Sequence, residues 1–387
     1  MQHVSEIVST HRNKIASSLF ILFAFLSCRK EQVIETEVSI IKNYLNLPAT
    51  PFNYSNPALP AFFSNEFITI QNNTPTDNPT TDWGATLGRV LFYDVRLSKS
   101  NSISCASCHK QEFGFADTAQ FSKGFDGKFT GRHSMSLLNA AFYLNGRFFW
   151  DERAASLEQQ VLMPIQDSLE MGLQLDELRS RLAATEFYPL LFKQAFGSTD
   201  ITNEGISKAL AQFVRSMISY QSKYDEGRSM VADRDSNFPN FTPQENRGKR
   251  IFMGNTNVNC FGCHNTDVFI TDHPRNNGLT LTNQDVGIYI HSNDPFDIGK
   301  FKAPSLKNVA VRHRYMHDGS IVGLINVLRH YDTGIQMNPN LDPHIGALNG
   351  KPATMNLSDD DLEALASFLE TLTDHKIMQD EKFSSPF

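Results

Sequence analysis

Cysteine is scarce in this chain, with five residues in 387. Four of them belong to two copies of one pentapeptide, Cys-x-x-Cys-His, at Cys105–His109 and Cys260–His264, while Cys28 stands alone near the N-terminus. No cysteine is left over for a framework of structural disulfides of the kind that small secreted domains use to supplement a small core. The two cysteine pairs are therefore expected to serve a chemical purpose.

Basic runs are also missing. The chain has 35 Lys and Arg residues against 42 Asp and Glu residues, a formal net charge of −7. Proteins that bind nucleic acid concentrate positive charge on one face to neutralise phosphates. We therefore expect no nucleic-acid partner.

Long hydrophobic runs are absent as well, since the apolar stretch at 15–26 falls short of the roughly 20 residues that cross a bilayer. It follows Arg12 and Lys14 and precedes Cys28, the order typical of an export signal. The segment resembles a bacterial lipoprotein signal, with Cys28 as the lipidated first residue; an ordinary signal peptide cleaved nearby is the alternative. We expect a periplasmic protein of a Gram-negative bacterium, held at a membrane only through lipid on Cys28.

Alternating patterns typical of half-buried strands are rare, and helical periodicity is common instead. Residues 203–224 place an apolar side chain at nearly every helical turn. Thr242 with Glu245, and Ser358 with Asp361, have the spacing of a capping box at the start of a helix. These patterns predict an all-α fold.

An internal repeat divides the chain into two modules. LGRVLF at 87–92 precedes the first pentapeptide, and RGKRIF at 247–252 precedes the second. The length suits two domains at about 100–200 residues each. With the boundary placed in the polar stretch 225–241, we expect a signal peptide at 1–27, a tether and N-terminal extension at 28–76, an N-terminal domain at 77–232 and a C-terminal domain at 233–387.

The pentapeptides fit three kinds of site unequally. Zinc sites commonly space their cysteine pairs about 15–20 residues apart, and redox dithiols favour a βαβ context; neither feature is present. In c-type haem attachment, two thiols one helical turn apart bind the haem and the adjacent histidine binds iron. We expect two covalently bound haem c groups, attached through Cys105, Cys108, Cys260 and Cys263, with His109 and His264 as iron ligands.

Other motifs carry a family resemblance. They are RHSMSLLN at 132–139, FFWDERA at 148–154, FKAPSLKNV at 301–309 and YMHDGS at 315–320. This ordered set resembles the bacterial dihaem cytochrome c peroxidase family, which includes the MauG-type enzymes, over about residues 83–373. The resemblance implies two cytochrome c-like domains. Their haems would be a peroxidatic one in 77–232 and an electron-accepting one in 233–387.

The same resemblance implies roles for individual residues. Glu170 matches the family's distal acid/base, Gln160 and Pro164 line the same pocket, and Trp150 matches a tryptophan between the haems. Cleavage of peroxide requires a proton to move from one oxygen to the other, and a single carboxylate near the iron can move it. Glu170, Gln160 and Trp150 are therefore the candidate catalytic residues.

The first haem departs from the family pattern on its far side. Residues 110–132 contain no histidine, whereas classical members have a capping histidine there, in the neighbourhood of Phe125. The first haem is expected to be open or capped by His133. His133 stands where the family often has an asparagine associated with a calcium ion between the domains, which places calcium in doubt.

The second haem has a different far-side candidate. The family's ligand lies 14 residues after the histidine of the His-Asp-Gly motif, and counting from His317 gives Tyr331. MauG-type enzymes have tyrosine there, while the peroxidases usually have methionine. His330 is the adjacent competitor, and Met316 and Met337 are weaker ones. His317 itself is expected to be structural.

Three functions remain open on this evidence. The leading one is reduction of hydrogen peroxide to water with electrons from a small redox protein such as a cytochrome c. The second is MauG-like oxidation of a protein or small-molecule substrate, and the third is electron transfer alone. Glu170 argues against the third because an electron carrier needs no distal acid. The family is commonly dimeric, so a homodimer stays open.

Overall fold

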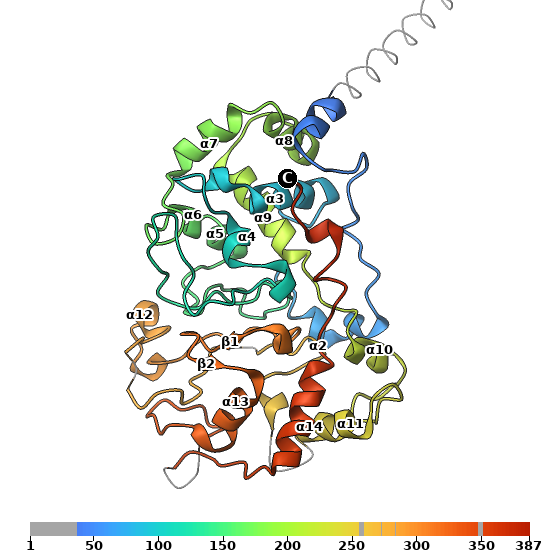
Figure 1. Cartoon of the computed structure of the whole chain (residues 1–387), viewed down its shortest axis with the longest axis vertical. Helices are drawn as coiled ribbons and strands as arrows, with labels where there is room; N and C mark the ends of the chain where they lie inside the picture. Colours follow the sequence, from blue (N-terminus) through green and yellow to red (C-terminus); the bar gives the residue numbers. More distant parts are fainter. Residues whose placement is uncertain (1–36, 255–258, 272, 283, 347–350) are drawn as a thin grey trace, which may run out of the picture.

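The computed structural model describes residues 37–254, 259–271, 273–282, 284–346 and 351–387 (Figure 1). The expected export signal and Cys28 lie outside these residues. Among the described residues, no helix combines the length and the apolar character needed to cross a membrane.

Short helices joined by long irregular segments make up most of the chain. After a helical segment at 37–44, the helices are α2 (Glu66–Thr69), α3 (Asp82–Tyr93), α4 (Cys105–Cys108), α5 (Leu157–Gln160), α6 (Met163–Gln166), α7 (Leu175–Ala183), α8 (Tyr188–Phe196), α9 (Asn203–Arg215), α10 (Lys223–Ser229), α11 (Pro243–Phe252), α12 (Tyr289–Ser292), α13 (Leu324–Arg329) and α14 (Asp359–Glu370). The predicted all-α class needs one correction. Strands β1 (Arg314–Tyr315) and β2 (Ile321–Val322) form an antiparallel ribbon, too short for a periodicity signal.

Helix starts follow the predicted side-chain caps. The Thr242 hydroxyl accepts a hydrogen bond from the Glu245 amide, and the Glu245 carboxylate accepts one from the Thr242 amide, which begins α11. Ser358 and Asp361 form the same reciprocal box at α14. Capping satisfies amide groups that the first helical turn leaves unpaired. Both capping boxes are therefore confirmed.

The predicted internal repeat reappears as two matching helix crossings. In the N-terminal half α3 packs on α9, and a Cβ at Gly88 would lie 2.0 Å from the Ala209 carbonyl oxygen. In the C-terminal half α11 packs on α14, and a Cβ at Gly248 would lie 1.8 Å from the Ala364 carbonyl oxygen. Each half thus brings the helix before its pentapeptide into backbone contact with a later helix at a glycine.

Of the three hydrophobic clusters among the described residues, the two largest divide the chain differently from the expected ranges. Tyr224 of α10 already belongs to the C-terminal core, ahead of the expected boundary at 232/233. The end of the chain returns to the N-terminal half, where Phe383 joins the core and the Ser384 carbonyl accepts from Arg89 Nε at 2.6 Å. Figure 1 shows this tail, in red, running from α14 back toward α3. The chain therefore crosses between the two halves after α9 and again after α14.

The first crossing follows α9, which ends at Arg215 instead of continuing to 224. Beyond it, side chains capture the backbone amides that a longer helix would use: the Asp374 carboxylate accepts from Tyr220 and Gln221. The helical stripe predicted over 203–224 is therefore wrong past α9. The apolar residues beyond Arg215 have helical spacing, but hydrogen bonds from the backbone amides to the distant Asp374 side chain replace those of a longer helix.

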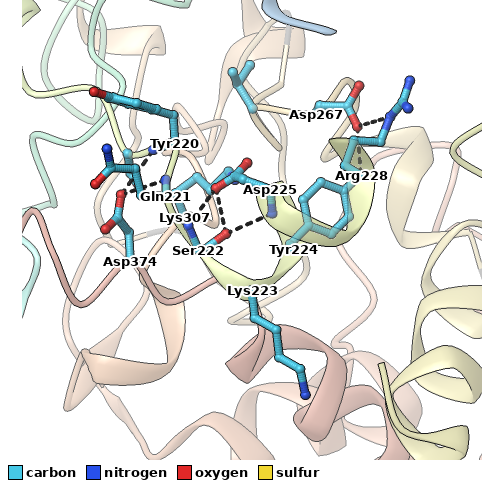
Figure 2. A network of polar contacts seen from close by, with 12 residues as sticks. Tyr220, Gln221, Ser222, Lys223, Tyr224, Asp225, Arg228, Asp267, Lys307 and Asp374 are labelled. Carbon is cyan, nitrogen blue, oxygen red and sulfur yellow. Dashed lines mark hydrogen bonds and ion pairs between the residues drawn. The ribbon is translucent and has the colours of Figure 1, made fainter. Parts of the chain in front are cut away.

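A buried ion pair fixes the same crossing (Figure 2). Lys307 Nζ lies 2.5 Å from Asp225 Oδ1, and both side chains are almost fully buried. The hydroxyl and the amide of Ser222 donate to Asp225 Oδ2 at 2.6 and 2.9 Å. This pair attaches α10 to the FKAPSLKNV segment at 301–309, which also forms a wall of the cavities described next.

Candidate active site

Two cavities lie beside the two pentapeptides. The N-terminal cavity, about 1480 Å³ including space open to solvent, is lined by His109, Gln160 and Glu170 among others. The C-terminal cavity, about 1450 Å³ on the same measure, is lined by His264 and Tyr331 among others. They share six wall residues: His133, Met135, Ser136, Trp150, Lys302 and Pro304. The two cavities are thus neighbours separated by a thin wall of side chains.

The first pentapeptide forms the single helical turn α4, followed directly by His109. His109 Nδ1 lies 3.0 Å from the Phe115 carbonyl oxygen. A carbonyl only accepts, so Nδ1 carries the proton and Nε2 keeps its lone pair. Burial lowers the pKa of His109, so the ring is neutral, the form in which histidine binds metals.

The second pentapeptide begins with a 3₁₀ turn at Cys260–Gly262, capped by the Asn259 side chain. Burial, with the positive charge of Arg275, lowers the pKa of His264 to about 4, so this ring is neutral too. Its Nδ1 is buried without a hydrogen-bond partner. A buried unpaired ring nitrogen is rare in folded proteins and suits a site that a bound group completes.

The cysteines do not resemble a redox dithiol or a shared zinc site. Burial raises the pKa of Cys105 and of Cys260 to about 12, whereas reactive thiols have lowered pKa values. The two pairs also belong to different halves, so they cannot form one four-thiolate site. Among the described residues, the one group of side chains close enough to share a metal ion is Cys263, Asp342 and His344. His109, directly after Cys105 and Cys108, lines the N-terminal cavity, and Cys260, Cys263 and His264 line the C-terminal one. This arrangement fits one haem beside each pentapeptide.

Glu170 lies in the N-terminal cavity together with Gln160, Pro164 and His109. It ends a tight loop after α6, in which its amide donates to the Asp167 carbonyl at 3.1 Å. Burial, followed by the nearby Asp167 carboxylate, raises the pKa of Glu170 to about 7. A carboxyl with this pKa can both accept and return a proton near neutral pH. The structure therefore brings together the residues that the family resemblance assigned to one pocket.

Trp150 lies in the wall between the cavities and is fixed at two points. Its indole N–H donates to the His133 carbonyl at 2.7 Å, and its own carbonyl accepts from the Lys302 amide at 2.8 Å. His133 Nδ1 in turn lies 3.0 Å from the Ala119 carbonyl. Trp150 is therefore in contact with both cavities, on a backbone held by both halves of the chain.

Tyr331 and its neighbour His330 have different environments. Tyr331 follows α13 in a π-helical turn and lines the C-terminal cavity with His264. His330 Nε2 lies 3.1 Å from the Asn277 carbonyl oxygen, outside the cavity wall. Burial raises the pKa of Tyr331 to about 12. Of the two methionine alternatives, Met316 lines the cavity and Met337 is exposed.

Two further residues singled out in the sequence have structural contacts. Phe125, in the neighbourhood of the family's capping histidine, lies behind the loop that ends at Glu170, and its amide donates to the Glu170 carbonyl at 2.8 Å. His317 stacks on Phe301 with ring centroids 3.6 Å apart. Phe125 therefore supports Glu170, and His317 packs against the wall of the C-terminal cavity.

Sequence reasoning assigned no role to some cavity residues. His291 lines the N-terminal cavity, with Nε2 3.4 Å from Asp151 Oδ2. Lys302 is 4% exposed and lies in the wall shared by both cavities. Lys302 lies within the FKAPSLKNV motif, so the signal was available, whereas His291 lies in a polar stretch with no motif.

Comparison with known proteins identifies the family of this chain. Residues 83–231 match the family model for di-haem cytochrome c peroxidase. The methylamine utilization protein MauG of Methylorubrum extorquens is 35% identical over 301 residues, covering 77% of this chain and 80% of that protein. Cytochrome-c peroxidase IdrP1 of a Pseudomonas species is 29% identical over 293 residues, covering 67% and 74%.

A solved structure is similar as well. It is a MauG-like protein associated with microbial copper homeostasis, 31% identical with a TM-score of 0.72, covering 86% of this chain and 99% of that one. These relatives are haem oxidoreductases of the peroxidase or MauG type. The chain belongs to the di-haem cytochrome c peroxidase family, which includes MauG.

Proposed function

We propose that the chain is an exported peroxidase that carries two covalently bound haem c groups, one in each half, and reduces hydrogen peroxide to water. The electrons come from a small redox protein. The export signal at 1–27 and the lipid site at Cys28 belong to this proposal. The observation that carries it is the position of Glu170 in the same cavity as His109.

Cys105 and Cys108 would hold a haem with His109 as a ligand of its iron, and this haem would supply the redox chemistry for peroxide reduction. Glu170 accepts the proton of one peroxide oxygen and delivers it to the other, which then leaves as water. Its pKa of about 7 suits both transfers. Gln160, on the same cavity wall, orients peroxide by hydrogen bonding.

The C-terminal half receives electrons from the donor protein and passes them on. Cys260, Cys263 and His264 would hold the second haem, with Tyr331 on its far side. Trp150 touches both cavities, and an electron that passes through its indole ring travels a shorter distance in each step. A role as electron relay is compatible with its role in packing.

The test is Glu170→Gln, which keeps the size and polarity of the side chain and removes the proton-accepting carboxylate. We expect peroxide turnover to fall about 10²-fold or more, with both haems retained and their optical spectra near those of the wild type. Glu177→Gln, at an exposed carboxylate on α7, is the matched control and should leave turnover unchanged. Turnover of Glu170→Gln within a few-fold of the wild type would refute the assignment.

A second candidate function is MauG-type oxidation of another molecule, and Tyr331 favours it. A hard oxygen ligand stabilises ferric iron more than methionine does, which suits storage of oxidising equivalents more than rapid electron uptake. Tyr331→Phe should change the low-spin electron paramagnetic resonance (EPR) signal of the second haem, while His330→Gln should leave it nearly unchanged. The opposite pattern would move ligation to His330.

A further inference from the structure

A buried tyrosine and a buried glutamate form a hydrogen-bonded pair beside the wall shared by the cavities. The Tyr143 hydroxyl donates to Glu152 Oε1, and the Asn145 amide group donates to Oε2 at 2.6 Å. Tyr143 is fully buried and Glu152 is 4% exposed. Neither residue has a part in the function proposed above.

Glu152 occupies a backbone conformation that is unfavourable for it. Its φ is +56°, and Phe149, three residues earlier in the same loop, has φ +69°. The loop is closed by hydrogen bonds between Phe148 and Ala154. Glycine adopts positive φ without a steric penalty, whereas the backbone of other residues is strained there. Burial of a carboxylate is unfavourable as well, so two penalties coincide at one residue.

The pair is one side chain away from both cavities. The Lys302 amine lies 3.7 Å from the ring centroid of Tyr143 and 4.5 Å from that of Phe148. Lys302 lines both cavities, and Phe148 lines the N-terminal one. The same loop carries Trp150 two residues before Glu152. Tyr143 therefore lies beside the expected electron path.

We propose that Tyr143 and Glu152 form a redox-active pair, in which Tyr143 gives one electron to the haem centres that peroxide has oxidised and its phenolic proton to Glu152. The inference rests on the proposed function, which supplies peroxide as the oxidant. The O–H bond of Tyr143 breaks and an O–H bond forms on Glu152 Oε1. The haem centre is reduced by one electron, leaving a neutral tyrosyl radical and a protonated glutamate. An electron from the donor protein reverses both transfers.

The surrounding charges require the proton to leave with the electron. Lys302, when protonated, places a positive charge over the Tyr143 ring, and such a charge opposes a positively charged ring radical. Arg147, whose Nε donates to the Glu152 carbonyl at 3.0 Å, adds positive charge on the same side. A carboxylate within hydrogen-bond reach removes this obstacle because it accepts the proton directly.

Two other buried tyrosines pair with carboxylates and provide the comparison. Tyr188 donates to Asp94 at 2.7 Å in the N-terminal core, and Tyr224 donates to Asp267 at 2.6 Å in the C-terminal core. None of the three tyrosines lines either cavity, but Lys302, whose amine lies over the Tyr143 ring, lines both. Tyr188 and Tyr224 have the same phenol–carboxylate chemistry in a different place. A redox function for Tyr143 thus predicts that position relative to the haems, and not hydrogen bonding alone, decides which tyrosine is oxidised.

The test uses the haem-loaded oxidised protein, mixed with stoichiometric hydrogen peroxide and freeze-quenched for EPR. The wild type should give a radical whose signal narrows when the protein contains ring-deuterated tyrosine. Tyr143→Phe should reduce the intensity of this signal at least 10-fold, and the control Tyr188→Phe should leave it unchanged. Glu152→Gln should lower the radical yield several-fold, since it removes the proton acceptor.

The outcomes separate this inference from the proposed function. A tyrosyl signal that persists in Tyr143→Phe would overturn the inference. So would a wild-type protein whose haem absorption responds to peroxide but which forms no tyrosyl radical. Haem absorption that does not respond to peroxide at all would instead overturn the proposed function, and with it the oxidant that this inference requires.

Discussion

The buried ion pair between Lys307 and Asp225 allows a quantitative prediction for stability. Lys307→Met replaces the ammonium with an apolar group of similar length and leaves Asp225 as an uncompensated buried charge. The Ser222 donors to Asp225 Oδ2 remain, but Oδ1 loses its charged partner. Removal of one partner of a buried pair destabilises by about 3–5 kcal/mol. We expect the free energy of unfolding to fall by this amount.

The structure gives two reasons to expect a loss of this size. Both side chains are at most 1% exposed, so water cannot replace the lost partner. The pair also joins α10 to the cavity-forming segment, so relaxation would disturb the crossing between the halves. The ammonium lies 5.1 Å from the ring centroid of Tyr224, and a methionine thioether can occupy this place without a clash.

Urea unfolding of the haem-loaded protein, followed by far-ultraviolet circular dichroism and by haem absorption, measures the effect. Asp225→Asn combined with Lys307→Met should recover up to about 3 kcal/mol, because no charge then stays buried alone. Lys208→Met, at an exposed pair with Glu204 on α9, is the control and should change little. A loss below about 1 kcal/mol for Lys307→Met, or a double variant no more stable than the single one, would refute the reasoning.

Two other predictions concern the helix crossings and pH. Gly248→Ala should destabilise the C-terminal half by about 1–3 kcal/mol, because the added Cβ would meet the Ala364 carbonyl oxygen at 1.8 Å. Gly88→Ala should destabilise the N-terminal half for the same reason. Thermal unfolding measures both effects, and unchanged midpoints would contradict the close helix crossings. Since the pKa of Glu170 is about 7 and its carboxylate form accepts the proton, the rate of reaction with peroxide should rise between about pH 6 and pH 8. Stopped-flow measurement of that rate should show no such rise in Glu170→Gln, and an identical profile in the variant would assign the proton transfer elsewhere.

The local features of this protein follow from short spacings along the chain. In the first pentapeptide, two cysteines one turn apart with a histidine directly after them lie close together in α4. Capping at Thr242 and Ser358 follows equally from contacts three residues apart. Backbone geometry fixes the relative positions of such neighbours, so the sequence could predict them. The helix predicted over 203–224 ended early because its competitors, such as Asp374, lie far away in the sequence.

Local spacing along the chain could not predict the site as a whole. The family resemblance assigned Glu170, Gln160 and Pro164 to one pocket, and in the structure all three line the cavity of His109. The 14-residue offset from His317 selected Tyr331, but spacing alone left the adjacent His330 as a competitor. The tertiary structure separates them: the Asn277 carbonyl holds His330 outside the wall, and Tyr331 lines the cavity.

The sequence by itself determined two modules, each with its pentapeptide, and the caps of α11 and α14. Only the tertiary structure decided which side chains form the wall between the cavities, and that Tyr143 and Glu152 meet beside it. Residues a few positions apart are placed by the backbone between them. Residues far apart are placed by the packing of whole segments, as where the tail at 377–387 returns to the N-terminal core and where the Lys302 amide donates to the Trp150 carbonyl.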